Sequence, residues 1–164
     1  MATMFNANEV YQIGVEIEKN GKEFYLAAAS AAEDPETEKL FRDLSAWEDT
    51  HVALFETLQQ QLPAEGGGFD VSDPDGEMTR YLKANADSHV FVINTDMSQL
   101  VQDCGSPDEV LKLAVRFEKD SVALYSSMKN VVPEDMGRET IDRLIQEELS
   151  HVSFLQTRIE SLKS

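Results

Sequence analysis

The sequence has little cysteine and no long apolar run. The single cysteine, Cys104, cannot form an internal disulfide, and it cannot supply the thiolate cluster of an iron–sulfur, rubredoxin-type or cysteine-zinc site. No stretch approaches the roughly 20 apolar residues of a membrane span. The N-terminus lacks the basic and apolar regions of a signal peptide. We therefore expect a cytoplasmic protein that does not associate with membranes.

Basic residues are also scarce. Lys and Arg total 14 against 31 Asp and Glu, which gives a formal net charge of −17. Such a surface repels phosphate, so nucleic acid and anionic lipid are excluded as expected partners. The acidic residues could simply keep the protein soluble. Some of them could instead be metal ligands, whose charge a bound cation would offset.

Glycine and proline are confined mostly to a few short clusters, and the segments between these clusters are rich in helix-forming residues. The length of 164 residues suits one domain with a sizeable core, and 41% of the residues are hydrophobic. We therefore predict a single all-α domain that covers residues 1–164.

The glycine and proline clusters mark the ends of the helices and predict two helical hairpins, over residues 6–62 and 106–162. Asn6 is the expected cap of the first helix, and Asp34 with Pro35 begins the second. Ser106 is the expected cap of the third helix, with Glu109 completing a capping box.

Residues 63–105 form one long connection between the hairpins. We predict short helices near "EMTRYLKANA" and from about Thr95 to Asp103, with the apolar run "VFVI" between them. A connection of this length can cross the whole molecule, so the expected architecture is an antiparallel four-helix bundle with one long crossover that contains short helices.

The two hairpins resemble each other at an offset of 100 residues without a gap. A Glu-x-x-His pair, Glu48 and His51 in "WEDTHVALF", recurs as Glu148 and His151 in "EELSHVSFL". On a helix, this spacing places both side chains on one face. Because the capping position and a tyrosine repeat in the same register, we interpret the match as a true internal repeat.

The repeat also pairs Glu18 with Glu118. Within its hairpin, each of these glutamates lies level with the Glu of the Glu-x-x-His pair, since both are about 15 residues, or roughly 22 Å of helix, from the hairpin loop. One Glu from each of two helices and Glu-x-x-His from each of the other two is the ligand set of a two-metal carboxylate site in a helix bundle. The predicted metal ligands are Glu18, Glu48, His51, Glu118, Glu148 and His151.

These motifs resemble the ferritin-like superfamily, and most closely its rubrerythrin branch. The similar segments are "GVEIEKNGKEFYLAA" with "EDTHVALF", and "AVRFEKDSVALYSSM" with "EELSHVSFL". The resemblance covers nearly the whole chain except the middle connection. It implies a ferritin-like fold and a non-haem centre of two iron ions, with Glu48 and Glu148 as bridging carboxylates. Manganese or a mixed manganese–iron pair remains open, because both metals accept carboxylate and imidazole ligands.

The chain departs from the rubrerythrin pattern in two ways. Rubrerythrins usually carry a rubredoxin domain with four cysteines, which is lacking here, so electrons would come from an external electron-transfer protein. Rubrerythrins also tend to have an additional Glu three residues after the third-helix ligand, where this chain has Ser121. That change casts doubt on rapid peroxide reduction, and Ser121 could leave a small opening at the site.

Three functional hypotheses follow. The first is a rubrerythrin-like peroxidase or oxidoreductase that reacts with H2O2 or O2 in oxidative-stress defence. The second is a ferroxidase or iron-storage protein that takes ferrous iron at the same site. The third is a metal-free helical scaffold or binding module. We expect a homodimer, in which the long connection would permit two chains to exchange helices.

Several further residues lie near these motifs. Tyr25 and Tyr125 share the face of Glu18 and Glu118; the resemblance implies hydrogen bonds near the metals, although core tyrosines would fit equally. We expect Trp47 to serve core or interface packing rather than electron transfer, and His89 to be an ordinary residue outside the repeat. Glu16, Glu23 and Glu147 point away from the ligand face and are assigned to the solvent.

Overall fold

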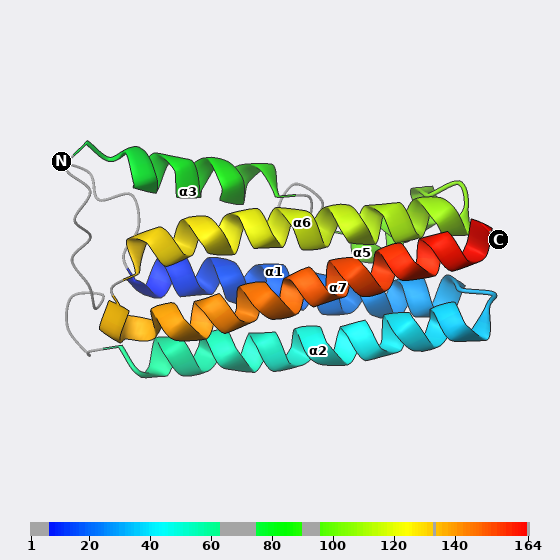
Figure 1. Cartoon of the computed structure of the whole chain (residues 1–164), viewed down its shortest axis with the longest axis horizontal. Helices are drawn as coiled ribbons and strands as arrows, with labels where there is room; N and C mark the ends of the chain where they lie inside the picture. Colours follow the sequence, from blue (N-terminus) through cyan, green and yellow to red (C-terminus); the bar gives the residue numbers. More distant parts are fainter. Residues whose placement is uncertain (1–6, 63–74, 90–95, 133, 164) are drawn as a thin grey trace.

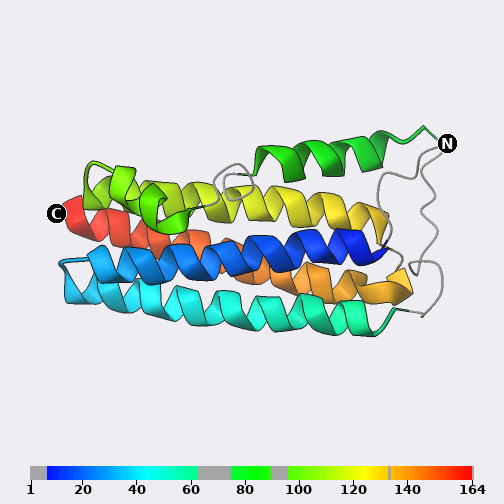
Figure 2. The ribbon, with the colours of Figure 1, turned by 180° about the vertical axis from the view of Figure 1, so that it is seen from behind.

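The computed structural model describes residues 7–62, 75–89, 96–132 and 134–163, and every regular element within these ranges is helical. The prediction of an all-α fold is therefore confirmed. Four long helices lie side by side as an antiparallel bundle (Figures 1 and 2). They are α1 (Ala7–Ala31), α2 (Pro35–Gln60), α6 (Pro107–Val131) and α7 (Glu139–Lys163).

The connection contributes two shorter helices, α3 (Glu77–Ser88) and α5 (Met97–Asp103). Helix α3 runs along the outer side of α6 (Figure 1) and buries Leu82 and Ala86. The Asn85 amide donates a hydrogen bond to the Ser127 hydroxyl of α6 at 2.5 Å, which ties the two helices together. The predicted short helices are thus both present, whereas the "VFVI" segment and most of the glycine-rich stretch lie outside the described residues.

Capping side chains begin the second and third long helices as the sequence predicts. The Asp34 carboxylate accepts a hydrogen bond from the backbone N–H of Thr37 (3.1 Å), and the Ser106 hydroxyl accepts one from that of Glu109 (3.2 Å). The capping box differs in one detail, because the Glu109 carboxylate accepts from the N–H of Gly105 instead of that of Ser106. Asn6, the predicted cap of α1, lies outside the described residues.

The internal repeat is visible in the helix boundaries, since α1 and α6 end at residues 31 and 131. The second hairpin differs at its turn, where a short π-helix, η1 (Glu134–Arg138), precedes α7. Gly137 lies there at φ +114°, and a Cβ atom on it would come within 2.9 Å of a Leu58 methyl and 3.0 Å of the Tyr11 hydroxyl. The turn therefore requires glycine for both its backbone angle and its close packing.

An arginine joins the two hairpins at one end of the bundle. Arg158 of α7 donates to the Thr37 hydroxyl (2.9 Å) and to the Glu36 carboxylate (2.6 Å), and it also pairs with Asp34. These contacts fix the position of α7 along α2, which sets the level of the residues farther along both helices. Among the described helices, none is long and apolar enough to cross a membrane.

Candidate metal centre

Six acidic and imidazole side chains meet inside the bundle, away from solvent. All four glutamates are 0% exposed, and the two imidazoles are 1% and 4% exposed. Each of the four long helices contributes at least one of them, and α2 and α7 contribute their Glu-x-x-His pairs. The structure thus brings together all six residues that the sequence predicts as ligands: Glu18, Glu48, His51, Glu118, Glu148 and His151.

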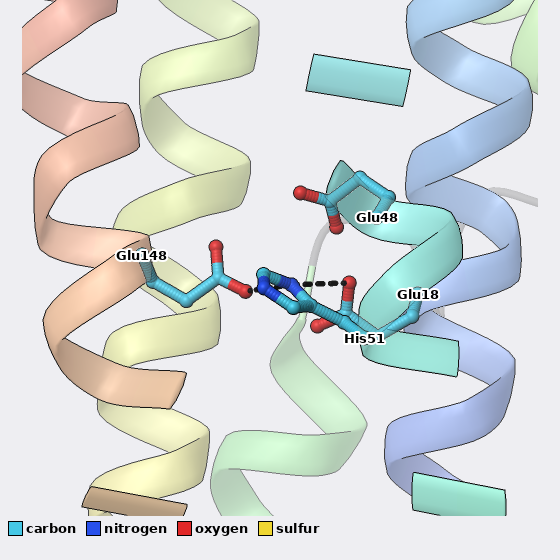
Figure 3. Close-up of side chains that lie close together, drawn as sticks. All are labelled: Glu18, Glu48, His51 and Glu148. Carbon is cyan, nitrogen blue, oxygen red and sulfur yellow. Dashed lines mark ion pairs between the residues drawn. The ribbon is translucent and has the colours of Figure 1, made fainter. Parts of the chain in front are cut away.

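The six side chains fall into two groups of four, and in each group the candidate ligand atoms all lie within 4.8 Å of one another. We call the group of Glu18, Glu48, His51 and Glu148 the His51 half-site (Figure 3). The His151 half-site consists of Glu48, Glu118, Glu148 and His151. Because Glu48 and Glu148 belong to both groups, they lie where carboxylates shared by two ions would lie.

Each imidazole turns its Nδ1 atom toward the carboxylates. In the His51 half-site, Nδ1 of His51 lies 3.0 Å from Glu148 Oε1 and 3.4 Å from Glu18 Oε2 (Figure 3). In the His151 half-site, Nδ1 of His151 lies 3.3 Å from Glu148 Oε2 and 3.5 Å from Glu118 Oε1. The two rings stack at 5.7 Å between centroids, so both half-sites share one compact centre.

Two tyrosines hold the outer glutamates through crossed hydrogen bonds. The Tyr25 hydroxyl of α1 donates to Glu118 Oε1 of α6 at 2.6 Å, and the Tyr125 hydroxyl of α6 donates to Glu18 Oε1 of α1 at 2.5 Å. Both tyrosines are 0% exposed. Each bond orients one carboxylate oxygen and leaves the other, Oε2, buried without a hydrogen-bond partner.

Eight buried side-chain atoms in the described part of the chain have no hydrogen-bond partner in suitable orientation, and all eight belong to these six residues. They are Oε2 of Glu18 and Glu118, both carboxylate oxygens of Glu48 and Glu148, and Nδ1 of each histidine. A buried polar atom without a partner costs about 1–3 kcal/mol, and more when it is charged. Oxygen and imidazole donors that converge in this way suit divalent metal ions, so the residues present fit a two-metal site.

The pKa shifts within the cluster also indicate a site for cations. Burial and the neighbouring carboxylates raise the pKa of Glu48 and Glu118 well above the usual value. Burial would lower the pKa of the two imidazoles, but contacts with the carboxylates overcome it and raise the pKa of His51 to about 12 and that of His151 to about 9. Burial alone would raise the pKa of Glu148, but contacts with Glu118 and both histidines outweigh it and lower this pKa well below the usual value. The centre thus favours positive charge, which protons or metal cations can supply.

The two imidazoles differ in which residue contacts their outer side, and the sequence interpretation did not predict either contact. Nε2 of His51 lies 2.7 Å from the Glu147 carboxylate, whose side chain is 58% exposed. His151 instead stacks on Trp47, at 5.1 Å between ring centroids and 11° between planes. Glu147 is exposed to solvent as predicted, but the prediction did not include its contact with His51. Trp47 is 37% exposed, so it is not a core residue.

The half-sites also differ at positions 21 and 121. A Cβ atom on Gly21 would lie 2.7 Å from the Phe117 ring and 3.0 Å from Glu48 Oε2, so this position has no room for a side chain. Ser121 is 0% exposed, and its hydroxyl lies 3.0 Å from Nε2 of His89. His89 is buried as well, and burial lowers its pKa to about 4. The expectation of an opening at Ser121 was wrong, since His89 covers that position.

Comparison with known proteins supports the fold. No family model matches the chain. An uncharacterized protein of Archaeoglobus fulgidus is 29% identical over 58 residues, which is 35% of this chain and 90% of that protein. A crystal structure from Thermotoga maritima, described as a candidate ferritin-like diiron-carboxylate protein, matches with a TM-score of 0.74 at 19% identity over 98% of both chains. The fold is therefore a ferritin-like helical bundle.

Proposed function

We propose that this chain is a di-iron carboxylate oxidoreductase of the rubrerythrin type, which reacts with peroxide or dioxygen and receives electrons from an external carrier. One observation carries the proposal. Among the described residues, the buried side-chain atoms without hydrogen-bond partners all belong to the four glutamates and two histidines, and they converge on one centre. In a metal-free scaffold, protons alone would have to compensate the buried charges, and these oxygen and nitrogen atoms would stay without partners.

The half-sites indicate how two ions would be held. Glu18 with His51 would bind one ion, Glu118 with His151 would bind the other, and the shared Glu48 and Glu148 would contact both. Four carboxylates carry four negative charges, which two divalent cations neutralise. When bound, two ferrous ions supply the two electrons that cleave an O–O bond, chemistry that no side chain of the cluster could perform alone.

The surrounding residues of the chain prepare this centre. Tyr25 and Tyr125 each hold one oxygen of an outer glutamate, so the other oxygen remains available for metal. The Glu147 carboxylate lies 2.7 Å from Nε2 of His51, where it would accept Nε2–H and leave the Nδ1 lone pair for a bound metal. The complete burial of the glutamates excludes bulk water from the reaction.

Anaerobic reconstitution with ferrous iron tests the proposal. Elemental analysis of protein purified without chelator should find about two metal ions per chain after iron supplementation. Stopped-flow mixing of the loaded protein with H2O2 or O2 should then show the absorption of oxidised iron, with one H2O2 consumed per two ferrous ions. Less than about half a metal ion per chain would contradict the proposal and favour a metal-free module.

Ferrous-iron oxidation for storage is the second candidate, because the net charge of −17 attracts cations to the protein. It uses the same centre but requires an assembled shell that holds many ions. Light scattering distinguishes the two functions, since a shell-sized particle would favour storage, whereas a homodimer, with or without exchanged helices, would favour the oxidoreductase.

A further inference from the structure

The chain has a single tryptophan, Trp47, and it occupies an unusual position beside the metal centre. The residue is 37% exposed, and its indole also packs against the Phe154 ring at 5.7 Å between centroids. The indole stacks almost parallel on the His151 imidazole, with 5.1 Å between ring centroids. A large aromatic ring therefore reaches solvent and a predicted metal ligand at the same time.

The inner end of this stack reaches the centre directly. His151 is 4% exposed, and its Nδ1 atom lies 3.3–3.6 Å from Glu148, Glu118 and Glu48. Two side chains in van der Waals contact thus span the distance from solvent to the candidate metal ligands. Electron tunnelling weakens exponentially with distance, so a short path through two stacked aromatic rings is a favourable one.

Three other aromatic rings near the centre, in the described part of the chain, offer no such path. Tyr25, Tyr125 and Phe117 are all 0% exposed. At the position that corresponds to Trp47 in the repeat, the second hairpin has Glu147, which contacts His51 but has no aromatic ring. The contact between a half-exposed ring and an imidazole ligand therefore occurs at the His151 half-site.

We propose that Trp47 is the residue through which an external one-electron carrier delivers electrons to the centre, by way of His151. This inference rests on the proposed function. Each transfer oxidises the carrier by one electron and reduces the iron-loaded protein by one electron. Two transfers, together with two protons from water, balance the reduction of one H2O2 to two molecules of water.

The charge of the surface selects the class of carrier. The chain carries a net charge of −17, and the Glu147 side chain, 58% exposed, lies on the same α2–α7 side of the centre. An anionic surface accelerates association with cationic donors and slows anionic ones. The carrier is therefore expected to present positive charge at its contact surface, and the rate should fall as salt is added.

Rapid mixing with a cationic one-electron donor tests the role of Trp47. Iron-loaded protein is oxidised with one equivalent of H2O2 and mixed without oxygen with hexaammineruthenium(II), and the loss of the oxidised-iron absorption is followed. Trp47→Leu should lower the second-order rate constant by about tenfold or more. Trp47→Phe, which keeps a ring on His151, should fall between Trp47→Leu and the parent protein.

Tyr81→Leu is the matched control, because Tyr81 is an exposed aromatic residue (58%) on α3. This variant should react at the parent rate. An unchanged rate in Trp47→Leu, or an equal loss in Tyr81→Leu, would overturn the role of Trp47.

Two further measurements separate this inference from the proposed function. Iron content, and a single turnover of chemically reduced protein with H2O2, should be unchanged in Trp47→Leu. A parent protein that binds no iron, or does not react with H2O2 or O2, would refute the proposed function and this inference with it. A loss of iron from Trp47→Leu alone would assign Trp47 a structural role and overturn electron delivery.

Discussion

The two half-sites are alike at their centre and different behind their imidazoles. Each combines one outer glutamate, one histidine and the shared pair Glu48 and Glu148, and each outer glutamate receives a hydrogen bond from a tyrosine of the opposite hairpin. Behind His51 lies a carboxylate, whereas behind His151 lies a half-exposed indole. The internal repeat thus provides equal ligands in unequal surroundings.

This difference has a chemical consequence. A carboxylate on Nε2 holds the imidazole in one tautomer and makes Nδ1 a stronger metal ligand. A stacked indole leaves the tautomer of His151 to other contacts but gives that ring an exposed aromatic neighbour. Under the proposed function, the His51 half-site would bind its ion more tightly, and the His151 half-site would exchange electrons with a partner.

The largest expected effect comes from a shared ligand. Glu148→Ala removes a carboxylate from both half-sites, so metal content should fall from about two ions per chain to nearly none. Glu118→Ala removes a ligand from the His151 half-site alone and should leave about one ion. Elemental analysis of the two purified variants measures this, and full metal content in Glu148→Ala would refute the shared role.

Loss of the Glu147 carboxylate behind His51 should weaken the binding of one of the two ions. Glu147→Ala should weaken binding of the ion in the His51 half-site by about 10–100-fold and leave the other ion within a few-fold. Calorimetric titration with a divalent metal should then resolve two affinities. Glu160→Ala, another exposed acidic residue of α7, serves as the control and should bind like the parent chain. Equal weakening of both ions in Glu147→Ala would show that the half-sites are not distinguished by this carboxylate.

The two tyrosines should have matching effects, because their hydrogen bonds are equivalent in the repeat. Tyr25→Phe and Tyr125→Phe each remove a buried hydrogen bond to a carboxylate and should lower the free energy of unfolding by about 1–3 kcal/mol. Denaturant unfolding of the metal-free variants measures this loss. A difference of more than about 1 kcal/mol between the two variants would show that the outer glutamates are not held equally.

His89, whose imidazole contacts Ser121, should produce the smallest effect. Burial lowers its pKa from 6.5 to about 4, so the unfolded chain binds more protons than the folded chain between these two pH values. Its contribution to stability is complete above pH 6.5 and is lost as the pH falls toward 4, by about 1 kcal/mol at pH 5.5. His89→Asn should therefore show a shallower loss of stability with acid than the parent chain, whereas Ser121→Ala, which keeps the imidazole, should retain the steeper slope.

Much of the fold and of the ligand set could be predicted because both depend on local or periodic signals. The caps at Asp34 and Ser106 involve side chains that bond within three residues, so the local sequence contains them. The six candidate ligands follow from the repeat and from their equal distance to the hairpin loops. Their role as metal ligands stays a prediction, although the structure brings them together.

The features that the sequence did not predict depend on how helices cross. Glu147 and Trp47 each precede a shared glutamate, and whether such a residue reaches solvent or the imidazole of the opposite hairpin is decided by the packing of α2 against α7. The π-helix at the second turn likewise depends on contact of Gly137 with Leu58 and Tyr11, which are far away in sequence. His89 lies just after α3, where no periodic pattern relates it to Ser121.

Anomalous diffraction at the iron absorption edge, from crystals of the iron-loaded protein, tests the central claim most directly. We predict two peaks inside the bundle, one beside Glu18 and His51 and one beside Glu118 and His151, with the carboxylates of Glu48 and Glu148 next to both. Data at the manganese edge would identify that metal if it replaced iron at either position. A single peak, peaks outside this cluster, or none at either edge would contradict a two-metal centre.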